Sequence, residues 1–288
     1  MPQAAADLGE PDASGEKTMI CALLLTMAAA PADIELTIDP NTSRIDVELC
    51  VQDECDSDQS SISGFLTVEL DCPLDPAAVA LEDFDVVADQ PLEFHLDYGF
   101  FGDIFADARD LRLFHAQPGD QPFNPIIDGS FTANNVPFLK DGVVAYLAEG
   151  LICGILRNLG VPCEDEVDLG DDPPGILDEV SADIAIEEGV LRISGRLDFD
   201  EPLDPENPEL GRITGFAIMN ASAPLPSGPD LDGDKDADLA DMRAFQLCFG
   251  GSGNPPGEAC PQGVNADLDN DDDVDLDDYR IFFRCFAK

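Results

Sequence analysis

The stretch "DIELTIDPNTSRIDVELCV", Asp33 to Val51, alternates apolar and polar residues on both sides of the segment "DPNTS". Alternation with a period of two places every second side chain on the same face of a β-strand. Asp, Pro and Asn are typical residues of tight turns. We therefore predict two antiparallel strands joined as a β-hairpin.

The same alternation continues along the chain to about Pro226. Pro- and Gly-rich turns separate the alternating segments, and one helical stretch, around Gly150 to Leu159, interrupts them. Many short strands with few helices predict an antiparallel β-sandwich or barrel domain over residues 33–221. The further predicted strands are Phe65–Leu70, Leu92–Tyr98, Leu111–His115, Val143–Leu147, Ala182–Ile186, Leu191–Phe199 and Ile213–Met219.

The first 32 residues have the features of an export signal. An apolar run from Ile20 to Ala30 precedes the small residues Ala30-Pro31-Ala32, which predicts a signal peptide cleaved after Ala32. The run is too short to cross a bilayer as a helix. Residues 1–18 are acidic and polar, unlike the basic start of a signal peptide, so we expect translation to begin at Met19. The alternative is a small buried apolar segment.

The cysteine count agrees with export. Of nine cysteines, Cys21 lies in the predicted signal peptide, which leaves eight, an even number that is typical of disulfide-bonded secreted proteins. Cys50 and Cys55 are close in sequence, as are Cys153 and Cys163, so each pair could close a local loop. The sequence leaves the pairing of four others open: Cys72, Cys248, Cys260 and Cys285.

The charge of the chain is strongly negative. Its 61 acidic and 14 basic residues give a formal net charge of −47 over 288 residues. Such a surface repels phosphate backbones and anionic lipids, which disfavours nucleic-acid binding and membrane-surface binding. It attracts cations, so the acidic residues are the first place to search for a site.

Two acidic segments near the C-terminus are copies of one another. They are "DLDGDKDADLAD", Asp230–Asp241, and "DLDNDDDVDLDD", Asp267–Asp278, and their similarity extends into the residues that follow each segment, which indicates an internal duplication. Aspartates recur at positions 1, 3, 5, 7, 9 and 12 of each copy, which is the ligand spacing of an EF-hand-type calcium loop. These candidate ligands are Asp230, Asp232, Asp234, Asp236, Asp238 and Asp241, then Asp267, Asp269, Asp271, Asp273, Asp275 and Asp278.

The density of charge predicts that folding of these segments depends on a cation. Two carboxylates about 4 Å apart repel by about 4 kcal/mol at an effective dielectric constant near 20. Each copy precedes a short apolar segment in which phenylalanines recur four residues apart, Phe245 with Phe249 and Phe282 with Phe286. Helices this short are marginal alone, so we expect the two to pack on one another. The alternative is a solvated acidic tail.

Two calcium loops, each followed by a helix, resemble a type I dockerin, the calcium-dependent module of bacterial cellulosomes. The resemblance covers Asp230 to Lys288, roughly a fifth of the chain, after a linker at residues 222–229. It implies that the aspartates at positions 1, 3, 5, 9 and 12 bind two Ca²⁺ ions. Position 7 contributes its backbone carbonyl in such loops, which leaves the side-chain roles of Asp236 and Asp273 open. The resemblance also implies docking onto a cohesin-like domain on a scaffold or cell surface.

Two departures from the family pattern affect these expectations. Position 6, where glycine is usual, holds Lys235 in the first copy and Asp272 in the second. Aspartate adopts a positive φ more readily than lysine, so we expect the first loop to bind calcium more weakly. Positions 10 and 11, which read the partner in the family and are often hydroxylic there, are Leu239-Ala240 and Leu276-Asp277 here.

We therefore expect a secreted bacterial protein in which a dockerin-like module docks a non-catalytic β-domain. One alternative is a component of polysaccharide catabolism, a glycoside hydrolase or a carbohydrate-binding module. The lack of tryptophan and the presence of only three tyrosines weigh against it, and His95 and His115 fit structural positions in strands. A second alternative is a β-barrel that binds an apolar ligand, whose sign would be a lined internal cavity. The sequence assigns no catalytic residue.

Overall fold

The computed structural model shows a mainly antiparallel β protein, which confirms the predicted fold class. The predicted signal peptide lies outside the described residues. Among the described residues, no helix combines the length and the apolar character needed to cross a membrane. The structure describes residues 33–286 with gaps at Leu74, Asp120, 204–206, 226–227, 235–236 and Asn270.

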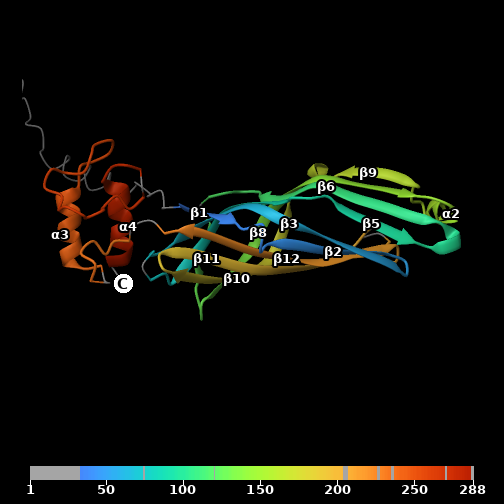
Figure 1. The fold of residues 1–288 in the computed structure, drawn as a ribbon, viewed down its shortest axis with the longest axis horizontal. Helices are drawn as coiled ribbons and strands as arrows, with labels where there is room; N and C mark the ends of the chain where they lie inside the picture. The colour runs from blue at the N-terminus through green and yellow to red at the C-terminus, as the bar shows by residue number, and fades with distance from the viewer. Residues whose placement is uncertain are drawn as a thin grey trace, which may run out of the picture. The chain divides into compact units, whose positions relative to one another are not determined.

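The strands form one antiparallel sheet, which is called the β-domain below (Figure 1). Its main order is β3–β2–β12–β11–β10–β8–β6–β4, and β4 pairs in turn with β3, so that the sheet closes on itself. The bounds are β1 (Asp33–Ile38), β2 (Arg44–Val51), β3 (Glu54–Leu70), β4 (Ala78–Ala88), β5 (Leu92–Asp97), β6 (Asp103–His115), β7 (Asn124–Pro125), β8 (Ser130–Ala148), β9 (Glu164–Asp168), β10 (Gly175–Glu187), β11 (Val190–Pro202) and β12 (Gly211–Pro224).

The predicted hairpin of β1 and β2 is wrong. Both strands pair in the same direction with the same neighbours, β3 and β12, so they form one interrupted row. Along β12, Ile38 is opposite Ala221 and Arg44 is opposite Ile218. The turn between them is held to β12, because the backbone N–H of Asn220 donates to Ser43 Oγ at 2.9 Å. The turn residues therefore produce a bulge in the row instead of reversing the chain.

The interior of the β-domain contains two apolar clusters. The first includes the fully buried Leu36, Val68 and Leu191 and lies between β1, β3, β4, β8, β10, β11 and β12. The second lies between β2, β5, β6, β8 and the helix α2 (Leu151–Asn158). This helix was predicted, and it buries Ile152 and Leu156 in the second cluster.

The wall of the closed sheet divides between β10 and β11. The two strands pair only from Ala182–Gly195 to Glu187–Val190. Before that point β10 pairs with β8 alone, over residues 175–181, and after it β11 pairs with β12 alone, over residues 196–202. The two strands therefore separate, and the separation opens one side of the sheet.

The C-terminal module, residues 230–286, contains the helices α3 (Leu239–Cys248) and α4 (Leu276–Phe286). The strand β12 ends at Pro224 and so includes the first three residues of the predicted linker. The rings of Phe245 and Phe282 pack with centroids 5.5 Å apart, in a small core that also buries Leu268. The predicted packing of the two helices on one another is confirmed (Figure 1).

Four disulfides join the eight cysteines of the described chain. Cys50–Cys55 and Cys153–Cys163 close local loops as the sequence suggested. Cys248–Cys260 joins the end of α3 to the following loop. Cys72–Cys285 joins the residues after β3 to α4 and so ties the module to the β-domain. Four disulfides indicate an oxidising environment.

Candidate metal centre

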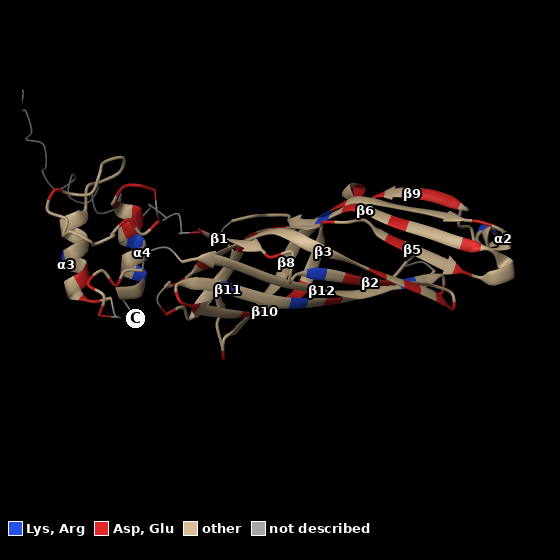
Figure 2. Cartoon of the chain, in the orientation of Figure 1, with Lys and Arg blue, Asp and Glu red and all other residues tan. Residues whose placement is uncertain are grey.

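The first acidic copy folds into a loop that brings four carboxylates together. One oxygen each from Asp230, Asp232, Asp234 and Asp241 lies within 4.8 Å of the others. Figure 2 shows acidic residues concentrated in the loops beside α3 and α4. Four carboxylates at this spacing repel one another strongly, and a cation among them would reverse that repulsion.

The position-12 carboxylate organises the first loop. Asp241 is fully buried, at 0% exposure. Its Oδ1 accepts the backbone N–H groups of Leu231 at 2.6 Å and Asp232 at 2.9 Å, and its Oδ2 accepts that of Asp238 at 2.8 Å. These donors stand at loop positions 2, 3 and 9, so the backbone winds around one carboxylate.

The second loop repeats this arrangement. Asp278 is also 0% exposed, and it accepts the backbone N–H groups of Leu268 at 2.5 Å, Asp269 at 3.3 Å and Asp275 at 2.7 Å. These are again positions 2, 3 and 9. The position-1 carboxylates match as well, because each accepts the backbone N–H of position 5. Asp230 accepts that of Asp234 at 3.1 Å, and Asp267 accepts that of Asp271 at 3.1 Å. The duplicated sequence therefore produces a duplicated geometry.

The second loop contains a buried carboxylate oxygen without a hydrogen-bond partner among the described residues, Asp273 Oδ1. Asp273 is 6% exposed, and its other oxygen accepts the N–H of Gly253 at 2.5 Å. Oxygens of Asp273, Asp275 and Asp278 lie within 4.8 Å of one another, as do oxygens of Asp267, Asp269 and Asp271. A buried carboxylate oxygen without a partner is costly, so this loop fits a bound cation. The sequence pattern left the role of the Asp273 side chain open and gave no sign that it is buried.

The carboxylate at position 9 also caps the start of the following helix in both loops. Asp238 Oδ1 accepts the N–H of Ala240 at 2.6 Å and caps α3, and Asp275 Oδ1 accepts the N–H of Asp277 at 2.7 Å in the same way. Asp238 lies outside the four-carboxylate group of the first loop, whereas Asp275 belongs to a group in the second. A side-chain oxygen at a helix start satisfies an N–H that has no partner within the helix.

Position 6 of the second loop has the conformation that its usual glycine provides. Asp272 has φ 74°, in the left-handed region that few residues other than glycine, asparagine and aspartate adopt. Lys235 and Asp236 of the first loop lie outside the described residues. Weaker binding by the first loop therefore stays a prediction.

The local electrostatics oppose full ionisation of the loops. Burial, with the neighbouring charges of Asp278 and Asp271, raises the pKa of Asp269 to about 6. Burial also raises the pKa of Asp278. In the first loop, burial and the nearby Asp234 carboxylate raise the pKa of Asp232. Each shift shows that the folded loop favours a proton, or another positive charge, at the cluster.

Without metal, the module is expected to lose stability as the pH rises from about 4 to about 7. The folded loop holds a proton on Asp269 with a pKa of about 6, against about 3.9 for an unfolded aspartate. The stabilisation that this proton gives the folded module is therefore complete below pH ~4 and is lost as the pH rises through about 6. Urea unfolding of metal-stripped protein that carries ¹³C at the methionine methyl groups, followed at Met242 in α3, measures this loss of stability.

The matched variant for this measurement is Asp269→Asn, which keeps the shape of the side chain but cannot titrate. We expect its stability to depend less on pH between 4 and 7 than that of the wild type. Equal pH profiles for the two proteins would show that Asp269 is not the responsible group.

The two histidines lie in strands β5 and β6. His95 is exposed on β5, where its ring stacks on Phe105 at 4.6 Å and its Nε2 lies 2.8 Å from Asp103. His115 is buried at the end of β6, edge-on to Phe84, and burial lowers its pKa. Both residues lie in strands, as the sequence predicted.

Comparison with known proteins adds no family to this description. No protein-family model matches the chain, and no similar curated protein is found. The central feature of the chain is a pair of matched acidic loops, each built around a buried carboxylate, that could hold metal ions.

Proposed function

We propose that the C-terminal module is dockerin-like, binds two Ca²⁺ ions and attaches the β-domain to a protein partner outside the cell. The observation that carries the proposal is the complete burial of Asp241 and Asp278 within matched acidic loops. A buried ionised carboxylate needs compensating charge, and backbone N–H groups supply part of it. Calcium supplies the rest well, because it takes six to eight oxygen ligands in a flexible geometry.

Export supports calcium as the ion. Four disulfides indicate an oxidising environment, and extracellular calcium modules typically bind at about 10⁻⁴–10⁻³ M. Mg²⁺ requires a near-octahedral shell and gives up its water reluctantly, so it suits a loop of many carboxylates less well. The acidic loops therefore favour calcium over magnesium.

Exposed leucines at matching positions support docking through the helix starts. Leu239 is 74% exposed and Leu276 is 52% exposed, and both stand at loop position 10, in the first turn of their helices. Position 10 is one of the two positions that contact cohesin in the family that the module resembles. Two apolar side chains at equivalent positions suit an apolar contact surface on a cohesin-like domain.

Docking is tested by flowing the metal-stripped full chain, reloaded with Ca²⁺ or Mg²⁺, over immobilised cohesin domains. We expect retention in calcium and its loss in magnesium or chelator, because the helix starts are ordered by the loops. The matched variant Leu239→Ser with Leu276→Ser keeps every loop carboxylate, so it should bind calcium normally and lose retention. Retention that is independent of calcium, or unchanged in this variant, would contradict the proposal.

A further inference from the structure

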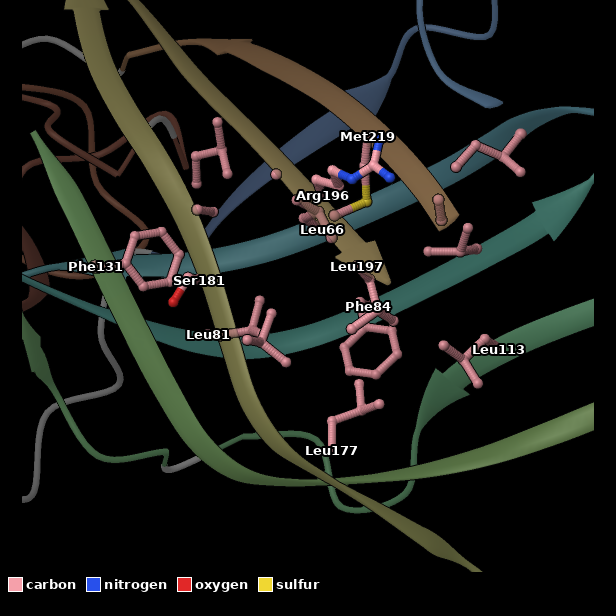
Figure 3. Close-up of a pocket in the computed structure, with 17 residues that line it drawn as sticks. Leu66, Leu81, Phe84, Leu113, Phe131, Leu177, Ser181, Arg196, Leu197 and Met219 are labelled. Carbon is pink, nitrogen blue, oxygen red and sulfur yellow. The ribbon is translucent and has the colours of Figure 1, made fainter. Parts of the chain in front are cut away.

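The β-domain encloses an apolar cavity of about 110 Å³ in its first cluster (Figure 3). Strands from all around the closed sheet contribute to its wall, including Leu66 on β3, Phe84 on β4, Phe131 on β8 and Met219 on β12. Of the described residues that line it, only Ser181 and Arg196 have polar side chains. The wall is therefore hydrocarbon almost throughout.

The cavity lies at the point where β10 and β11 separate. Their pairing ends at Ala182–Gly195, and both of these residues line the cavity, as do the residues next to them, Ser181 and Arg196. Beyond this point the apolar Leu177 of β10 and Leu197 of β11 line the cavity together with Phe84 (Figure 3) and are partly buried. A ligand that enters between the separated strands therefore breaks no strand pairing of the described residues.

An apolar cavity of this kind favours an apolar occupant. Water needs two to four polar partners to be stable in a buried site, and this wall offers few. An empty space also costs its lining side chains their dispersion contacts. An engineered apolar cavity of about 150 Å³ in another protein stays dry and binds benzene. A cavity of about 110 Å³ therefore suits one ring or a short alkyl chain.

The charges around the entrance disfavour an anionic ligand. Arg196, at the edge of the cavity, already pairs with Asp198 at 2.6 Å and lies over the ring of Phe216 at 3.7 Å. Its positive charge is therefore compensated within the chain. With a net charge of −47, the protein repels anions in general. An uncharged molecule meets neither obstacle.

We propose that this cavity binds a neutral hydrophobic small molecule through a ring or alkyl chain of about six carbons, which enters between β10 and β11. The binding site belongs to the β-domain and is separate from the calcium loops. It gives the β-domain a ligand-binding role beyond the proposed docking function.

The methionines provide a direct test. Met219 lines the cavity, whereas Met242 lies on α3 in the C-terminal module, so the second serves as an internal control. The calcium-loaded full chain, labelled with ¹³C at the methionine methyl groups, is titrated with benzene, 1-hexanol and hexanoate. We expect saturable shifts of the Met219 signal with the two neutral probes, an unmoved Met242 signal, and hexanoate binding weaker by about tenfold or more.

Two variants test the location. Ala217→Leu fills the cavity and should weaken 1-hexanol binding by about tenfold or more, because the hydrocarbon chain loses its space. Ala185→Leu adds the same atoms on the exposed face of β10 and should change nothing. Leu177→Phe narrows the entrance and provides a second test of the location if Ala217→Leu folds poorly. The proposal would be overturned if the Met219 shifts did not saturate, if Met242 showed the same shifts, or if the shifts persisted in both cavity variants. Hexanoate binding as tight as that of 1-hexanol would overturn the preference for neutral ligands.

Discussion

The double variant Asp241→Ala, Asp278→Ala is expected to lose metal binding at both loops and the order of α3 and α4. Each carboxylate accepts three backbone N–H groups that hold its loop closed. Hydrogen bonds to charged groups contribute about 1.5–3 kcal/mol each, so each loop loses several kcal/mol of stabilisation. Helices this short do not persist alone. Calorimetric titration should show two calcium ions bound by the wild type and none by the variant.

The control removes the same number of charges from exposed aspartates of the β-domain, Asp53→Ala with Asp178→Ala. It should leave the calcium stoichiometry unchanged. Each single variant, Asp241→Ala or Asp278→Ala, should retain binding at the other loop. Tyr98 and Tyr146 of the β-domain share the near-ultraviolet signal with Tyr279, so the order of the helices is followed at the ¹³C-labelled methyl group of Met242 in α3. Unchanged affinity and stoichiometry in the double variant would rule out these carboxylates as ligands.

Several of the strands that alternation predicted have one buried face. β1, for example, buries Ile34, Leu36 and Ile38 and exposes the residues between them. β4 and β9 escaped prediction for opposite reasons. β4 buries four consecutive residues, Val79 to Glu82, so its pattern has no period of two. β9 exposes all five of its residues, and only its pairing with β8 makes it a strand.

The hairpin prediction failed because a turn motif carries no information about distant partners. Both arms of the predicted hairpin pair with β12, at least 160 residues later in the chain. A local signal for a chain reversal cannot compete with such long-range pairing when both arms fit the same neighbours. The packing of the first cluster, and the cavity inside it, depends on this topology and was equally hidden from sequence patterns.

The acidic loops were predictable because their residues are close in sequence and are repeated. Spacing alone placed the position-12 aspartates, and the structure groups them with their predicted neighbours. Two features of the module could be found only in the folded structure. The burial of Asp273 depends on Gly253, twenty residues earlier, and the partner of Cys285 lies 213 residues away.

Removal of the Cys72–Cys285 disulfide by the double variant Cys72→Ser, Cys285→Ser is expected to separate α4 from the β-domain. The bond closes a loop with a sequence separation of 213 residues, for which the chain-entropy relation gives about 5 kcal/mol as an upper figure. Among the described residues, the other contacts at this joint include one ion pair and one apolar contact. Arg284 pairs with Glu69, whose burial raises its pKa, and Ile281 lies near Leu70. The variant leaves these contacts in place, so the loss of stability measures the disulfide itself.

The matched control is Cys50→Ser with Cys55→Ser, which opens a loop with a sequence separation of only 5 residues. The same relation gives about 2 kcal/mol for it, so calorimetry in calcium should find the Cys72–Cys285 variant about 10 °C less stable than the control. The position of Cys285 in α4, directly after the second loop, adds a second readout. Without the bond, α4 has more conformational freedom before calcium binds, so binding costs more conformational entropy. The calcium affinity of the second loop should therefore fall, while that of the first loop should not change. Equal melting temperatures and unchanged calcium affinity in the two variants would show that the joint between the module and the β-domain holds without its disulfide.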